Sequence, residues 1–172
     1  MAGIQTQTDS LESLGLPHQT DIAGGGFSTV AVVGGGTMGK GLAQAIAQTG
    51  VEVILCERNG NELERALEGL GGQLDHEIER WGMTESEKRA ILVRVSGTTD
   101  VRDVAEAKLV IEAIDEELSS KMTLFSKLDA ICPDDTILVS NTGSLSVTEI
   151  GPATLRGDRV IGTHFLTPGP TL

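Results

Sequence analysis

Three glycines at a fixed spacing are the residues of this 172-residue chain whose arrangement most clearly suggests chemistry. Gly34, Gly36 and Gly39 form a G-x-G-x-x-G pattern in the segment VAVVGGGTMGKG. The first glycine of such a pattern makes a tight turn, the second lets the backbone approach a pyrophosphate, and the third lets a helix pack close to a strand. Backbone N–H groups and the positive helix end, with Thr37 and Met38 in its first turn, then bind the anion. The pattern predicts a dinucleotide-binding loop, and a purely structural turn is the alternative.

An acidic residue in the next apolar segment points to the same ligand. Glu57 ends the run VEVILCE, where this type of loop has a carboxylate that accepts hydrogen bonds from the adenosine ribose. Its charge would repel a ribose 2′-phosphate, so NAD is favoured over NADP as the cofactor. Arg58, the next residue, could turn toward such a phosphate, although a solvated loop arginine is the simpler interpretation.

Apolar runs that alternate with helical patterns would position these residues. Strand-like runs lie at residues 28–34, 51–57, 108–114, 136–140 and 159–165, and helical patterns lie at 37–50, 61–81, 84–93 and about 117–130. Strands that are apolar on both faces are typical of buried parallel sheets, and the alternation with helices requires crossover connections. The predicted fold class is α/β, a Rossmann-type doubly wound, mostly parallel sheet with helices on both faces. Capping boxes are predicted at Thr84–Glu87 and Ser146–Glu149.

The two ends of the sequence differ in character. Residues 1–27 are polar, end near three glycines and offer little to bury, so we expect a flexible N-terminal leader there. Residues 28–172 are predicted to form one NAD-binding Rossmann domain.

Charge and cysteine content exclude several classes of function. The net charge of −12 and the pI near 4.6 disfavour nucleic acid and membranes as partners. Cys56 and Cys132 stand alone in apolar surroundings, so we expect no metal site and no disulfide framework. No apolar run reaches the roughly 18 residues of a membrane helix, and the first Lys or Arg is Lys40, which argues against a targeting peptide. We therefore expect a cytoplasmic protein.

Five motifs in order give the chain a family resemblance. The segments GGGTMGKG, GTTD, LVIEAIDEEL, SNTGSLSVTEI and RVIGTHFLTP together resemble the NAD-binding domain of the L-3-hydroxyacyl-CoA dehydrogenase family, over about residues 28–172. The resemblance implies oxidation of the 3-hydroxyl of an acyl-CoA to a ketone with hydride transfer to NAD, as in fatty-acid β-oxidation.

The resemblance also implies roles for single residues. Glu116 and Lys121 match positions that contact NAD near its nicotinamide end, and Arg80 matches a lysine that contacts the CoA substrate. His164 matches the catalytic histidine, which acts as general base, and an imidazole suits this role because it titrates near neutral pH. Without the resemblance, a solvated charged pair, a surface arginine and a structural histidine are the simpler interpretations.

Two positions depart from the family's motifs. Gly143 replaces the serine that hydrogen-bonds the substrate oxygen, a loss that usually costs about 10²–10³ in rate, and the neighbouring Ser144 could substitute. Thr167 replaces an asparagine of the cofactor site, and its hydroxyl is a partial replacement.

The family continues beyond the matched region with a glutamate that orients the histidine and with a helical second domain. This chain ends at Leu172. We therefore expect weak or no activity of the chain alone, and an apolar face that docks such a helical domain or forms a homodimer. Two alternatives stay open: a non-catalytic NAD-binding module, and a relative that acts on a hydroxyacyl group bound to a carrier protein.

Overall fold

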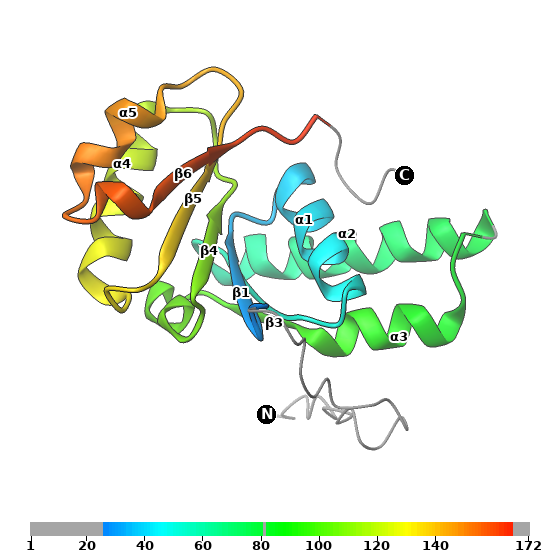
Figure 1. The fold of residues 1–172 in the computed structure, drawn as a ribbon. Coiled ribbons are helices and arrows are strands. Elements are labelled where there is room, and N and C mark those ends of the chain that lie inside the picture. Colours follow the sequence, from blue (N-terminus) through cyan, green and yellow to red (C-terminus); the bar gives the residue numbers. More distant parts are fainter. Residues whose placement is uncertain (1–25, 81, 167–172) are drawn as a thin grey trace, which may run out of the picture.

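The computed structural model describes residues 26–80 and 82–166, and six parallel strands form a single sheet in this part of the chain (Figure 1). Their order is β3-β2-β1-β4-β5-β6. The strands are β1 (Thr29–Val33), β2 (Glu52–Cys56), β3 (Val95–Thr98), β4 (Leu109–Glu112), β5 (Ile137–Asn141) and β6 (Val160–Thr163). The predicted Rossmann-type fold is thereby confirmed. The predicted leader lies almost entirely outside the described residues.

Helices cover both faces of the sheet (Figure 1). On one face lie α1 (Thr37–Gln48), α2 (Gly60–Glu79) and α3 (Glu85–Arg94); on the other lie α4 (Leu118–Ile131), α5 (Val147–Ile150) and the 3-10 helix η2 (Val101–Glu106). Strand β1 shows why continuous apolar runs fit this arrangement. Val30 and Val32 belong to the first core, whereas Ala31 and Val33 belong to the second, because strand side chains alternate between faces.

The sequence interpretation missed strand β3. This strand lies at one edge of the sheet, where it pairs with β2 alone, and its Ser96 and Gly97 are exposed. Strand β3, with the sequence VSGT, therefore lacks the continuous apolar run that identified the other five.

One of the two predicted capping boxes is correct. At the start of α3, the Glu87 N–H donates to Thr84 Oγ1 at 3.2 Å, and the Thr84 N–H donates to Glu87 Oε2 at 2.7 Å. The box at Ser146 is wrong, because its side chain makes no cap bond. The N–H of Glu149 donates instead to the main-chain oxygen of Ser146, so a backbone turn takes the place of the side-chain cap.

No helix in the described ranges is both long enough and apolar enough to cross a membrane.

Candidate cofactor and catalytic site

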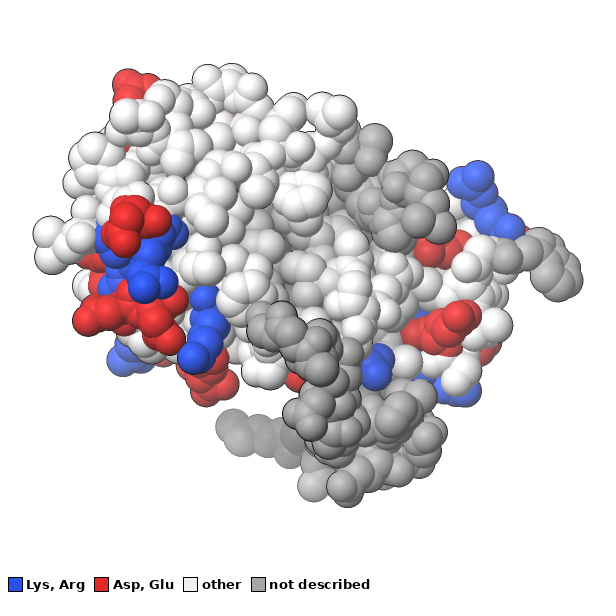
Figure 2. Space-filling model, in the orientation of Figure 1, with Lys and Arg blue, Asp and Glu red and all other residues white. Residues whose placement is uncertain are grey.

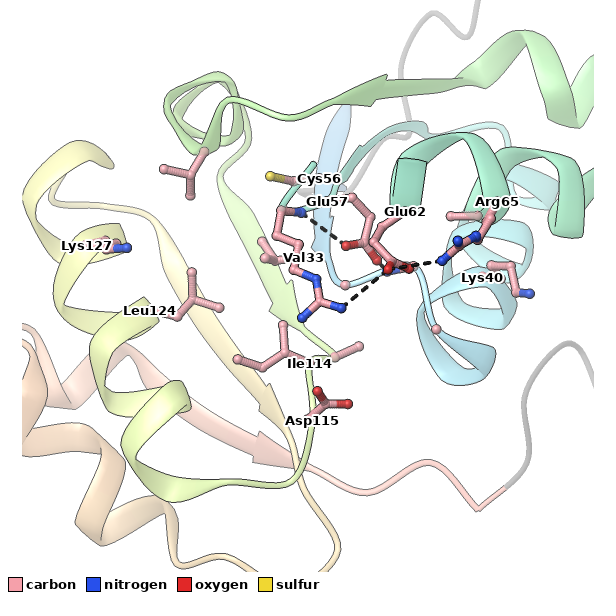
Figure 3. Close-up of a pocket in the computed structure, with 17 residues that line it drawn as sticks. Val33, Lys40, Cys56, Glu57, Glu62, Arg65, Ile114, Asp115, Leu124 and Lys127 are labelled. Atoms are coloured by element: carbon pink, nitrogen blue, oxygen red, sulfur yellow. Dashed lines mark hydrogen bonds and ion pairs between the residues drawn. The ribbon is translucent and has the colours of Figure 1, made fainter. Parts of the chain in front are cut away.

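A cleft of about 440 Å³ opens at the carboxyl edge of the sheet, beside the ends of β1 and β4 (Figure 3). The strand order reverses at β1: the chain runs from β1 to β2 and β3 on one side and then crosses from β3 to β4 on the other. Doubly wound folds bind ligands in the crevice at such a switch point. The cleft is lined by the glycine loop, the ends of β2 and β4, and side chains of α2 and α4, including Glu57, Glu62, Asp115, Leu124 and Lys127.

The three glycines of the motif have different surroundings. Gly34 has a φ of +101°, and a Cβ there would lie 2.7 Å from the oxygen of Ala113. A Cβ on Gly39 would lie 1.7 Å from the oxygen of Gly34, so α1 packs directly on the turn. Nothing lies within 4 Å of a Cβ on Gly36, which borders open space. The loop is therefore close-packed at its two ends and open in the middle.

Gly35 also needs to be a glycine, which the motif does not indicate. A Cβ at this position would lie 2.5 Å from Ala66 Cβ and 3.2 Å from Glu57 Oε1. The side chain of Glu57 accepts hydrogen bonds from the Gly35 N–H at 2.5 Å and from the Arg58 N–H at 3.1 Å. The carboxylate predicted to bind ribose is thus held against the glycine loop.

The first turn of α1 is suited to an anion. Its N-cap, Gly36, has no side chain to accept a cap bond, and the turn contains no acidic residue. The leading N–H groups of a helix have no partner within the helix, and the helix dipole adds positive potential there. Thr37 is exposed and Met38 is half-buried in this turn. The residues present therefore fit a pyrophosphate.

Cys56 lines the same cleft but is poorly suited to react. Burial, together with the nearby Glu57 charge, raises the pKa of its thiol to about 11. The thiolate is the nucleophilic form, so this cysteine is inert at neutral pH.

Glu116 lies at the other half of the site and accepts several hydrogen bonds from the loop after β5. Its Oε1 atom accepts from Thr142 Oγ1 at 2.5 Å, from the N–H groups of Gly143 and Ser144 at 3.0 and 3.1 Å, and from Ser144 Oγ at 3.0 Å. Partial burial raises the pKa of this carboxyl, but the hydrogen bonds from Thr142, Ser144 and Lys121 together lower it to about 2. Glu116 is therefore ionised and holds the loop in place.

Lys121 is fully buried beneath Glu116. Its ammonium donates to Glu112 Oε1 at 2.6 Å and to the main-chain oxygen of Asn141 at 2.9 Å, and it lies 3.3 Å from Glu116 Oε2. Glu112 Oε2 accepts in addition from Ser140 Oγ at 2.6 Å. The predicted contact of Lys121 with a cofactor stays a prediction, since here the ammonium binds oxygens of the protein itself.

His164 follows β6 and is exposed. A Cβ on Gly143 would lie 2.5 Å from its Cε1 atom, so the imidazole stands against the glycine that replaces the family's serine. The backbone after His164 is tied to β5, because the N–H of Phe165 donates to Asn141 Oδ1 at 3.3 Å. The structure thus brings His164, Gly143 and Ser144 together, while Thr167 lies outside the described residues.

Arg80 is not part of this arrangement. It is exposed at the C-terminal cap of α2, whereas the cleft contacts the N-terminal half of that helix. At about 1.5 Å of rise per residue, Arg80 lies about 27 Å along the helix from Glu62. Its contact with a CoA substrate stays a prediction. Among the described residues, no group of three or more His, Cys, Asp or Glu side chains could hold a metal ion.

Comparison with known proteins identifies relatives of this arrangement. The model of the family "3-hydroxyacyl-CoA dehydrogenase, NAD binding domain" matches residues 29–172. The chain is 41% identical over 143 residues to a probable 3-hydroxybutyryl-CoA dehydrogenase of Bacillus subtilis, covering 83% of this chain and 50% of the relative. It is 39% identical to the 3-hydroxyadipyl-CoA dehydrogenase of Escherichia coli, covering 84% of this chain and 30% of that protein.

Solved structures give the same result. The crystal structure of (S)-3-hydroxybutyryl-CoA dehydrogenase from Ralstonia eutropha superposes with a TM-score of 0.82 at 35% identity, covering 86% of this chain and 52% of that one. This chain therefore spans about half the length, or less, of these relatives.

Proposed function

Because the chain belongs to the family of 3-hydroxyacyl-CoA dehydrogenase NAD-binding domains, we propose that it is the cofactor half of an enzyme that oxidises an L-3-hydroxyacyl-CoA to the 3-ketoacyl-CoA. The observation that carries this proposal is the position of His164 against the Gly143–Ser144 loop, at the same edge of the sheet as the glycine loop.

In this proposal, one set of residues binds the cofactor and another acts on the substrate. The glycine loop and the first turn of α1 would hold the pyrophosphate of NAD, and Glu57 would accept hydrogen bonds from the adenosine ribose. NAD, when bound, supplies the acceptor for the hydride that leaves the substrate carbon. An imidazole nitrogen of His164 takes the proton of the 3-hydroxyl, which is general-base catalysis.

The substrate oxygen needs a hydrogen-bond donor beside this base. Gly143 has no hydroxyl, so the donors near the imidazole are the N–H groups of residues 143 and 144 and the hydroxyl of Ser144, all of which bind Glu116. A donor that must first leave a carboxylate stabilises an oxyanion poorly. We therefore propose that the chain alone turns over slowly.

A non-catalytic NAD-binding module is the second candidate, and Gly143 favours it. The glycine loop and Glu57 do not need the serine hydroxyl to bind a cofactor, whereas the substrate half lacks that hydroxyl. Such a module would bind NAD with no turnover.

The surface near β6 supports a partner. Ile161, Phe165 and Leu166 are exposed by 47%, 41% and 82%, an unusual density of large apolar side chains at a sheet edge. On the side of the molecule seen in Figure 2, the charged side chains gather toward the two sides, and few lie on the described surface between them. We propose that this face docks a helical domain like that of the longer relatives, or a second copy of the chain. The buried free cysteines support a reducing, cytoplasmic location.

Calorimetric titration with NAD, followed by an assay of NADH formation, tests these proposals. At high protein concentration, 3-hydroxybutyryl-CoA should give slow NADH formation that His164→Gln abolishes while NAD affinity stays within about threefold. NAD binding without turnover would favour the non-catalytic NAD-binding module over the enzyme. Turnover with a carrier-protein thioester but not with the CoA thioester would show that the substrate is bound to a carrier protein. Absence of NAD binding would contradict both candidates.

A further inference from the structure

Basic side chains gather in the cleft although the protein is acidic. Four of its 13 Lys and Arg residues, Lys40, Arg58, Arg65 and Lys127, line this one cleft in a chain of net charge −12. NAD has a hydroxyl, not a phosphate, at the 2′ position of its adenosine ribose, and backbone N–H groups can hold its pyrophosphate. A cleft that binds NAD therefore does not need all four basic side chains. What these charges do depends on their partners.

Glu62 is the partner of two of the arginines. Its Oε1 atom lies 3.4 Å from Arg58 Nη2 and 3.2 Å from Arg65 Nη1, and the dashed lines to Glu62 in Figure 3 mark these ion pairs. The Glu62 side chain is 32% exposed, whereas those of the two arginines are 74% and 71% exposed. One carboxylate, less exposed than its partners, therefore pairs with two exposed guanidinium groups at the cleft.

The position of Glu62 is set by the start of α2. Its backbone N–H donates to Asn59 Oδ1 at 3.0 Å, the N-cap bond of this helix. Glu57 is occupied differently, because its carboxylate accepts from the N–H groups of Gly35 and Arg58. The two carboxylates thus have separate tasks: Glu57 faces the glycine loop, and Glu62 faces the arginine side chains.

We propose that Glu62 determines the cofactor specificity of this cleft. By holding Arg58 and Arg65, it withholds both guanidinium groups from a ribose 2′-phosphate, and its own charge repels that phosphate. The cleft therefore disfavours NADP, whereas the 2′-hydroxyl of NAD can still donate a hydrogen bond to Glu57. The inference rests on the proposed NAD-binding function and extends it to a residue outside the glycine motif.

The effect should be moderate in size. Glu62→Gln removes the charge that pairs with both arginines, and because exposed ion pairs are individually weak, the gain from releasing each arginine is small. A guanidinium that turns to a phosphate can bind it through two N–H groups. Glu62→Gln should therefore raise the affinity for NADP about tenfold and change that for NAD less than about threefold.

Calorimetric titration of the full chain with NAD, NADP, AMP and adenosine 2′,5′-bisphosphate tests the proposal. The last two ligands differ only in the 2′-phosphate, so the difference between their affinities measures recognition of this group alone. Glu64→Gln is the matched control, because Glu64 is an exposed carboxylate on the same helix and does not line the cleft. Glu62→Gln preserves the backbone N-cap bond, and thermal unfolding verifies that each variant folds.

The expected result is a change in the NADP-to-NAD affinity ratio in Glu62→Gln that is absent in Glu64→Gln and is reversed by adding Arg58→Gln. An unchanged ratio, or an equal change in both single variants, overturns the role of Glu62 while NAD binding by the wild type still supports the proposed function. A wild type that binds no NAD overturns the proposed function and this inference together.

Discussion

Two glycines of the glycine loop, Gly36 and Gly39, are required for different reasons. Gly39 is glycine because the oxygen of Gly34 occupies the place of its side chain, whereas Gly36 is glycine although its surroundings are empty. Packing explains the first residue, and close approach of a ligand to the backbone would explain the second. The loop therefore offers a way to separate folding from binding by substitution at two neighbouring sites.

Gly36→Ala should leave folding intact and weaken NAD binding. The new Cβ meets nothing within 4 Å and the residue has a φ of −63°, so the free energy of unfolding should change by less than about 1 kcal/mol. The methyl group would occupy space through which the pyrophosphate approaches the backbone, so NAD affinity should fall at least about tenfold. Gly39→Ala is the contrast, with a loss of about 3 kcal/mol in stability from the clash. Equal NAD affinity of wild type and Gly36→Ala would contradict this role.

Glu116 should make part of the stability depend on pH. Its folded pKa of about 2 is below the ordinary value of 4.5, so the ionised form stabilises the fold above about 4.5, and this contribution is lost as pH falls toward 2. The difference in the free energy of unfolding between wild type and Glu116→Gln should accordingly shrink over this range. Chemical denaturation at several pH values measures it. A difference that does not vary with pH would show that the loop does not depend on this charge.

At the scale of elements, a buried charged network joins β4, α4 and β5. Glu112 on β4, Lys121 on α4 and Ser140 on β5 are all fully buried, and Lys121 and Ser140 both donate hydrogen bonds to Glu112. The N–H of Ile114 also donates to Glu112 Oε1, at 2.8 Å. Buried charges of this kind are tolerated because each has a partner. The network fixes the ends of two strands beneath Glu116.

Lys121→Met should be strongly destabilising. The substitution leaves the Glu112 carboxylate buried without its ammonium, a change that typically costs about 3–5 kcal/mol. Adding Glu112→Gln should recover part of the loss, since the unpaired charge is then removed. Urea denaturation of the single and double variants measures the coupling. A double variant as unstable as the sum of the single ones would contradict a direct pairing.

The sequence predicts the elements better than the contacts between them. Continuous apolar runs identify five strands, and in β1, β2, β4 and β5 this pattern follows from burial on both faces. Strand β3 has no such run, because its Ser96 and Gly97 are small or polar and exposed. The burial of Lys121 could not be predicted, since its partners Glu112 and Asn141 are brought to it only by the sheet. The constraint on Gly35 could not be predicted either, because it comes from Ala66 on α2.

For the molecule as a whole, the sheet divides the site into two halves. Strands β1 and β2 end at the glycine loop and Glu57, while β4, β5 and β6 lead to Glu116, Gly143 and His164. The site thus depends on the pairing of β1 with β4, where the halves meet. Strand β6 ends the sheet, so one side of it has no neighbour among the described strands.

This free edge should make the isolated chain associate. Ile161→Lys on β6 should shift the sedimentation of a concentrated sample toward the monomer, because a charge at an edge strand opposes strand pairing and apolar contact. Leu155→Lys is the matched control, since Leu155 is fully exposed but lies outside the strand. Equal effects of the two substitutions would argue against β6 as the contact.

The tight packing of α1 on the turn at Gly34 should affect the kinetics of NAD binding. Because contacts fix both ends of this loop, we expect no slow rearrangement of the loop before NAD binds. Association should then occur in a single step, with an observed rate that rises linearly with NAD concentration and does not level off.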